Sequence, residues 1–213
     1  MEKAVFVLEL IGVAAFAISG ALSALKKGAD VFGTIILAVT TALGGGVIRD
    51  VLLGKLPPRM FVSYPYLLAA VAAALIVFAD AYFRRRRFTE NRERIAAVTN
   101  VFDAVGLGVF TVSGMNMAML ESNNVLLILF LGVATGIGGG MLRDMMTGTM
   151  AKVLRKQVYA TASIAGGLVY YALYILLNVN EIFSALAGMA VIILLRMLAT
   201  HYKWDLPSVK NEA

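Results

Sequence analysis

The chain contains no cysteine and a single histidine, His201, among its 213 residues. Disulfides and thiolate metal sites are therefore excluded, and one histidine alone cannot build a zinc site. Charged residues make up only 15% of the sequence, against 60% hydrophobic residues and a mean hydropathy of +0.83. Such a chain has too little polar surface to cover a soluble globule, so we interpret it as an integral membrane protein and expect no bound cofactor.

Seven apolar stretches are long enough to cross a bilayer as helices, which takes about 20 residues for about 30 Å of hydrocarbon. The first stretch is too long for a secretory signal, carries Glu9 and precedes no good cleavage site, so we expect it to stay in the mature protein. The predicted fold is all-α, with transmembrane helices at about residues 4–25, 32–53, 63–83, 97–119, 125–148, 158–178 and 181–201.

The net charge of +6 comes from basic residues concentrated in the connections between spans. In a membrane protein these residues report orientation rather than nucleic-acid binding. We predict a multi-pass protein of the inner (plasma) membrane, with its N-terminus outside and its C-terminus in the cytoplasm. The outer side then holds only Lys3, Lys55 and Arg59. The cytoplasmic side holds Lys26, Lys27, Arg84, Arg85, Arg86, Arg87, Arg92, Arg94, Lys152, Arg155, Lys156, Lys203 and Lys210.

The sequence contains an internal duplication. Residues 44–54 read GGGVIRDVLLG and residues 138–148 read GGGMLRDMMTG, an offset of 94 residues. The same offset holds without a gap beyond this motif. It matches Gly12 with Gly106, Phe16 with Phe110, Ser19 with Ser113, and Glu9 with Asp103.

The duplication predicts an inverted repeat. Each copy contains three spans, and an odd number of crossings makes the two copies enter the membrane from opposite sides. We therefore divide the chain into a first repeat (1–83), a basic cytoplasmic connector (84–96), a second, inverted repeat (97–178), and a seventh helix with a tail (179–213). The arginine run in the connector is a topology signal, with binding of anionic membrane lipids as a secondary use.

Each repeat carries a glycine triplet near or just past the middle of a span, about 20 Å from its start. Glycine in a helix costs about 1 kcal/mol relative to alanine, so three in succession require a reason. Two reasons stay open: close packing of helices, or a kinked or unwound helix whose carbonyls face a water-filled cation path. Recurrence at matched depth favours the path. The residues concerned are Gly44, Gly45, Gly46, Gly138, Gly139 and Gly140.

Charged side chains follow both triplets. Ionisable residues this deep in a span cost several kcal/mol unless they are paired or hydrated. Inverted topology brings Glu9 and Arg49 to one depth near the outer face, and Asp103 and Arg143 to the equivalent depth near the inner face. We predict the ion pairs Glu9–Arg49 and Asp103–Arg143, acting as structural locks or as polar constrictions of a path. The alternative partners of the arginines are the residues that follow them, Asp50 and Asp144.

Threonine hydroxyls precede both triplets, at Thr40, Thr41 and Thr135. Threonine in a membrane helix either presents its hydroxyl to a polar path or bonds back to its own helix. The sequence leaves both uses open, so we treat the three residues as candidate path-lining groups.

These features together resemble one known family. Two GGGxxRD motifs, a 3+3 inverted repeat, a seventh helix and 213 residues are similar to the prokaryotic branch of the trimeric intracellular cation (TRIC) channels. The resemblance implies a homotrimer in which each protomer holds its own pore. It also implies that glycine-kinked second and fifth helices line this pore and that monovalent cations, chiefly potassium, pass through it.

Related bacterial sequences are also described as having a glycine-transporter domain, which gives a rival interpretation. A channel needs a continuous hydrated path, whereas an amino-acid carrier needs an occluded midplane site that changes sides. A non-transporting membrane scaffold is the third alternative. No Walker lysine follows either triplet, so we expect neither nucleotide binding nor an enzyme.

The charge asymmetry predicts that residues 121–124 lie outside the cell. A cysteine introduced by Ser122→Cys in this cysteine-free chain should react with membrane-impermeant thiol reagents in intact cells. Labelling that appears only after the cells are broken would reverse the predicted topology.

Overall fold

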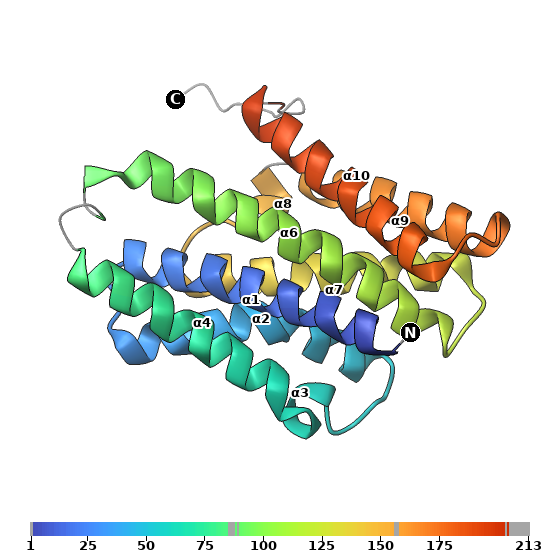
Figure 1. Cartoon of the computed structure of the whole chain (residues 1–213), viewed down its shortest axis with the longest axis horizontal. Coiled ribbons are helices and arrows are strands. Elements are labelled where there is room, and N and C mark those ends of the chain that lie inside the picture. Colours follow the sequence, from blue (N-terminus) through green and yellow to red (C-terminus); the bar gives the residue numbers. More distant parts are fainter. Residues whose placement is uncertain (1, 85–87, 89, 156–157, 203, 205–213) are drawn as a thin grey trace.

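The structure, a computed structural model, describes residues 2–84, 88, 90–155, 158–202 and 204. Within these residues it is helical, with short connections (Figure 1). Several basic residues used above for topology lie outside the described residues: Arg85, Arg86, Arg87, Lys156, Lys203 and Lys210. The elements are α1 (Glu2–Lys26), α2 (Val31–Leu52), α3 (Arg59–Val62), α4 (Tyr64–Phe83), α6 (Arg92–Met119), α7 (Val125–Met146), α8 (Lys152–Arg155), α9 (Val158–Tyr171), a π-helical turn η1 (Ala172–Leu176) and α10 (Glu181–His201).

Seven of these helical segments are long and apolar enough to span a membrane, which confirms the predicted all-α fold with seven spans. Two boundaries differ from the prediction. The fourth span begins at Arg92 instead of near residue 97, and the sixth ends in the wider turn η1. The short helices α3 and α8 occupy equivalent places in the two repeats, directly before the third span of each.

Local sequence signals set the helix ends. Asp30 caps α2 by accepting a hydrogen bond from the Gly33 amide at 2.7 Å, and Asn124 caps α7 in the same way. Gly54 and Gly148, which follow α2 and α7, adopt positive φ angles of 68° and 63°. Glycine takes this conformation without a steric penalty, so it ends both helices at the same point of the repeat.

Four helices, α1, α2, α6 and α7, form the centre of the bundle (Figure 1). Helix α4 packs on α1 and α2, and its counterpart α9 packs on α6 and α7. Helix α10 has no counterpart in the repeat and covers α9 and α6. The start of α1 and the end of α10 lie at opposite ends of the bundle, as an odd number of spans requires.

The two glycine triplets meet where α2 crosses α7. A Cβ atom added to Gly45 would overlap the carbonyl oxygen of Thr135, and one added to Gly139 would overlap that of Thr41. The two backbones therefore touch directly, which only glycine allows. Both helices are continuous α-helix through their triplets, so the expected unwinding does not occur. A bend at the triplets stays a prediction.

A second pair of symmetry-related residues meets beside this crossing. The rings of Phe16 on α1 and Phe110 on α6 stack with their centres 5.4 Å apart. Gly106 makes room for the Phe16 ring, since an added Cβ would overlap it. The centre of the bundle is thus a glycine crossing next to an aromatic pair, and both relate one repeat to the other.

The crossing predicts that Gly45→Ala and Gly139→Ala destabilise the protein to a similar degree. Each added methyl meets a helix backbone, so overpacking should cost about 1–3 kcal/mol. Gly46→Ala is the matched control, because its Cβ would have Arg49 Nη2 as its nearest neighbour at 3.7 Å. Thermal unfolding in detergent measures the difference. Equal unfolding temperatures for the three variants would contradict the backbone contact.

Candidate functional site

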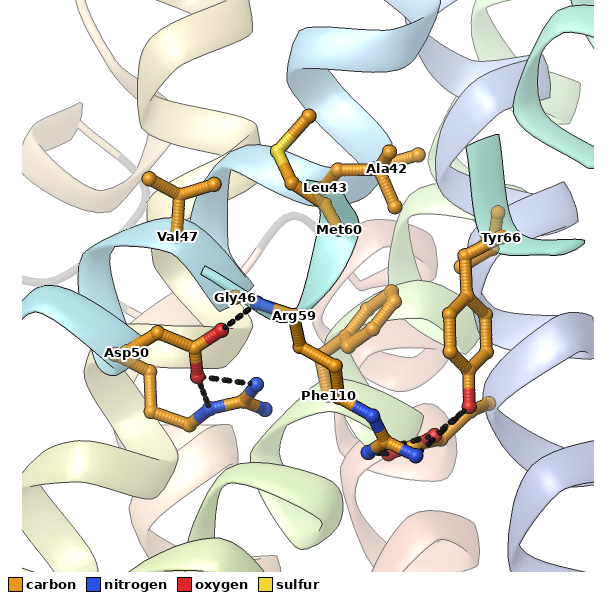
Figure 2. Close-up of a pocket in the computed structure, with 12 residues that line it drawn as sticks. Ala42, Leu43, Gly46, Val47, Asp50, Arg59, Met60, Tyr66 and Phe110 are labelled. Atoms are coloured by element: carbon orange, nitrogen blue, oxygen red, sulfur yellow. Dashed lines mark hydrogen bonds and ion pairs between the residues drawn. The ribbon is translucent and has the colours of Figure 1, made fainter. Parts of the chain in front are cut away.

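In the first repeat, the motif's Arg and Asp form a fork at the end of α2. Arg49 donates from Nε and Nη2 to Asp50 Oδ1, at 2.9 and 2.7 Å. The other oxygen, Asp50 Oδ2, accepts the backbone amide of Arg59 at 2.8 Å and so fixes the start of α3 (Figure 2). Both side chains are at least 95% buried. Asp50 therefore orients the arginine and anchors the next helix at once.

The second repeat contains the same fork. Arg143 donates from Nε and Nη2 to Asp144 Oδ1, at 2.9 and 2.8 Å, and Asp144 Oδ2 accepts the backbone amide of Lys152 at 2.8 Å. Here the arginine also reaches further. Its Nη1 donates to Asp103 at 2.5 Å and to the Ser19 hydroxyl at 2.8 Å. The expected Asp103–Arg143 pair is present, and it includes the alternative partner Asp144 as well.

The expected Glu9–Arg49 pair is not formed. Glu9 accepts hydrogen bonds from the hydroxyls of Tyr66 and Ser113, the latter at 2.6 Å, and Arg59 Nη1 lies 3.3 Å from Glu9 Oε2. The physical reason is that α3 brings Arg59 to the carboxylate from outside the repeated motif, while the fork with Asp50 holds Arg49 back. Matched depth was therefore not enough to select the partner.

A cavity of about 40 Å³ lies in the first repeat between these groups. Figure 2 shows Asp50, Arg59 and Tyr66 around it, with Ala42, Leu43 and Gly46 forming part of the wall. A cavity of this size has room for water, and the charged residues in its largely apolar wall can bind it. Phe110 lines it as well, so the cavity reaches the aromatic pair at the centre of the bundle.

At the equivalent place in the second repeat, one carboxylate meets three cationic side chains. Asp103 is fully buried and faces Arg143, Lys152 at 3.5 Å and Arg196 of α10 at 3.7 Å. The guanidinium of Arg196 also lies over the ring of Tyr159, 4.5 Å from its centre. Asp103 Oδ2, the Tyr159 hydroxyl and Arg196 Nε are buried without a hydrogen-bond partner among the described residues. We call Asp103, Arg143, Lys152, Tyr159 and Arg196 the inner cluster.

The other residues of the triplets lie in different surroundings. Gly46 lines the cavity, whereas a Cβ at Gly140 would meet the Tyr159 hydroxyl at 2.6 Å. Gly44 and Gly138 pack against side chains of the partner helix. Most of the six glycines therefore serve packing, and Gly46 borders a cavity. The role of the triplets in a cation path stays a prediction.

The candidate threonines differ in position. The hydroxyls of Thr41 and Thr135 donate to carbonyls of their own helices, each at 2.6 Å, and both residues are fully buried. They pack against Gly20 of α1 and Gly114 of α6. Thr40 is only partly buried. None of the three is among the residues that line the cavity, so their path-lining role stays a prediction.

Sequence reasoning missed Arg59, Tyr66, Lys152, Tyr159 and Arg196 as members of the site. The first four form two matched pairs at an offset of 93 residues, because the connection before α8 is one residue shorter than that before α3. Extending the repeat through this single gap would have found them. Arg196 carried a different signal: it is a charged residue well inside a predicted span.

Two inverted three-helix units with buried charges at both ends of a shared core define a membrane transport protein of the inverted-repeat class. The comparisons with known proteins agree. The family model described as "Glycine transporter" matches residues 6–81 and 100–175, two segments that begin and end 94 residues apart. The chain belongs to this family.

Curated relatives carry the family designation UPF0126. The inner membrane protein YadS of Escherichia coli K12 is 36% identical over 204 residues, which cover 96% of this chain and 95% of YadS. A membrane protein of Deinococcus radiodurans is 37% identical over 199 residues, covering 92% of this chain and 87% of the relative.

Solved structures of TRIC channels share the fold of this chain, which confirms the resemblance to the TRIC channel family. A prokaryotic TRIC channel crystallised in 0.5 M KCl superposes with a TM-score of 0.85 at 32% identity, covering 97% of this chain and 100% of the other. A TRIC cation channel studied for its conductance gives a TM-score of 0.81 at 39% identity, covering 97% and 98%. The Rhodobacter sphaeroides orthologue gives 0.82 at 30% identity, covering 95% and 100%.

The burial of Asp103 predicts a large effect of neutralising it. Asp103→Asn leaves the buried guanidiniums of Arg143 and Arg196 without the carboxylate that they share, which should cost about 3–5 kcal/mol. Asp80→Asn is the control, because the Asp80–Arg84 pair is more than 60% exposed on both sides and should contribute about 0–1 kcal/mol. Thermal unfolding of both variants measures this. Similar losses for the two would contradict a buried pair.

Burial lowers the pKa of the Lys152 ammonium to about 8, although the neighbouring Asp103 carboxylate opposes the shift. Between pH 8 and the usual lysine value of 10.5, the folded protein loses this proton while the unfolded chain still holds it. The free energy of unfolding therefore rises with pH in this window. We expect the unfolding temperature of the wild type, relative to that of Lys152→Met, to rise from pH 8 to pH 10. Parallel curves would contradict this.

Proposed function

We propose that the chain forms a channel for monovalent cations, chiefly potassium, and works as a homotrimer with one pore in each protomer. The observation that carries this proposal is the match to TRIC cation channels over 97% of the chain at 39% identity. The name of the Rhodobacter sphaeroides orthologue, a trimeric intracellular cation channel, supports the trimer. The cargo is a hydrated cation, and membrane lipids surround the assembly.

The site supports this function by its position and its charge. The cavity beside α2 is lined by two carboxylates, Glu9 and Asp50, and by two arginines, Arg49 and Arg59. Their charges balance, so a cation entering there meets no net positive barrier. With the N-terminus outside, this cavity faces the outer side and the inner cluster faces the cytoplasm. We infer that the path runs from this cavity past Gly46 and Phe110 toward the inner cluster.

A glycine carrier is the second candidate, because the family model that matches both repeats is described as a glycine transporter. A bound zwitterion needs a partner for its ammonium and another for its carboxylate, and carboxylates and guanidiniums both line the cavity. A channel and a carrier differ in one measurable respect: only the channel gives unitary currents.

The test is reconstitution of the purified protein in planar bilayers under a potassium gradient. We expect unitary currents that reverse near the potassium equilibrium potential, and no saturable glycine uptake in matched liposomes. Gly46→Leu should lower the unitary conductance in assembled protein, because its side chain would extend into the cavity. Gly46→Ala, with its small side chain, should conduct more than Gly46→Leu.

Silent bilayers together with saturable glycine uptake would replace the channel by the carrier. Unchanged conductance in Gly46→Leu, in protein that still assembles as a trimer, would remove the cavity from the path.

A further inference from the structure

Helix α10 lies outside the inverted repeat, yet it carries a buried charge into the site. The Arg196 side chain is only 3% exposed. It lies five residues before the end of α10, about 7.5 Å along the helix axis, within reach of the membrane surface for a long side chain. It points into the bundle instead, with Nη2 3.7 Å from Asp103 Oδ2. This placement is costly, because Arg196 Nε is buried without a hydrogen-bond partner among the described residues.

The first repeat contains the same grouping with a different arginine. Arg59 Nη1 lies 3.3 Å from Glu9, and its guanidinium lies 5.4 Å from the centre of the Tyr66 ring. In both halves an arginine bridges a buried carboxylate and the face of a tyrosine. Arg59, however, comes from α3 and its side chain is 43% exposed.

The sequence counterpart of Arg59 is Lys152, which does not take this place over the tyrosine. Its ammonium lies 3.5 Å from Asp103 Oδ2 and donates to Asn100 at 2.9 Å. A guanidinium is planar and stacks on an aromatic face, whereas an ammonium is a compact charge. Arg196 therefore supplies to the inner half what Arg59 supplies to the outer half, from a helix that is not part of the repeat.

The hydroxyls of the two tyrosines also differ in their partners. Tyr66 donates its hydroxyl to Glu9, but the Tyr159 hydroxyl has no hydrogen-bond partner among the described residues. The Asp103 carboxylate is held by Arg143 at Oδ1 and faces Arg196 and Lys152 at Oδ2.

We propose that Arg196 is a positioning residue for the inner cluster, which forms the inner barrier of the path. Arg196 holds Asp103 in place for Arg143, so the position of α10 determines whether this barrier is closed. The proposal rests on the proposed function only in that the inner cluster lies on the ion path. A shift of α10 away from α9 and α6 would withdraw one cation from Asp103 and leave the Tyr159 ring uncovered. The barrier would then loosen at the inner end alone.

Cysteine accessibility tests this without requiring a current. Ser19→Cys places a thiol beside Arg143 at the inner end, and Ser113→Cys places one at the matched position beside Glu9. Each reporter is combined with Arg196→Gln, with Arg196→Lys, or with Arg84→Gln, whose arginine is 63% exposed and serves as the matched control. A small cationic methanethiosulfonate is applied, and the rate of modification is measured in purified protein.

We expect Arg196→Gln to speed modification of Ser19→Cys by about tenfold or more, the effect of losing one charge-assisted interaction from the closed state. The rate at Ser113→Cys should not change. Arg196→Lys should give a rate between those of the wild type and Arg196→Gln, and Arg84→Gln should match the wild type. Equal rates for Arg196→Gln and Arg84→Gln, or equal acceleration at both reporters, would overturn the proposal.

Should Arg196→Gln fail to fold, Tyr159→Leu provides an independent route, because it removes the ring beneath the guanidinium and changes no charge. It should also accelerate modification at Ser19→Cys alone, and an unchanged rate would contradict the proposal. A protein that gives no current but shows the selective acceleration would refute the channel while leaving the role of Arg196 intact.

Discussion

The direct contact between the backbones of α2 and α7 at Gly45 and Gly139 is the constraint on which the rest of the structure depends. Because no side chain separates the two helices, each triplet fixes the depth of the other. The charged residues that follow each triplet are thereby placed at matched distances on either side of the crossing. The Phe16–Phe110 stack fills the space beside it. The crossing thus sets the centre of the bundle, and polar groups are left to the two ends.

The other residues of the repeated motif have separate structural roles. The aspartate uses one oxygen to orient the preceding arginine and the other to hold the first amide of a short helix. The final glycine ends the long helix with a positive φ angle. One short segment therefore packs two helices together, orients an arginine and anchors the following short helix. These linked roles give a physical reason for the same residue types to occur together in both repeats.

The two ends share residue types and the fork of the motif, but Glu9 and Asp103 take different partners. In the first repeat, Arg49 stays with Asp50 and a cavity lies beside Glu9. In the second repeat, Arg143 reaches across to Asp103, and Lys152 and Arg196 lie near the same carboxylate. The inverted repeat thus pairs the same residue types in two different ways within a single chain. Helix α10, which is not part of the repeat, contributes Arg196 to the cluster around Asp103.

The sequence by itself determined the class of protein, the seven spans and the duplicated motif, because hydropathy, span parity and internal similarity are local or additive quantities. It also showed that Arg143 needs a buried carboxylate, but it left Asp103 and Asp144 open, and the structure pairs Arg143 with both. Only the tertiary structure decided that Glu9 pairs with Arg59 instead of Arg49, that the triplets stay helical, and that Arg196 joins Asp103. These outcomes depend on which of several side chains at similar depth converge from distant elements. Depth in the membrane shows that a carboxylate needs a partner, but the competition among cations is settled by the direction from which each helix presents its side chain.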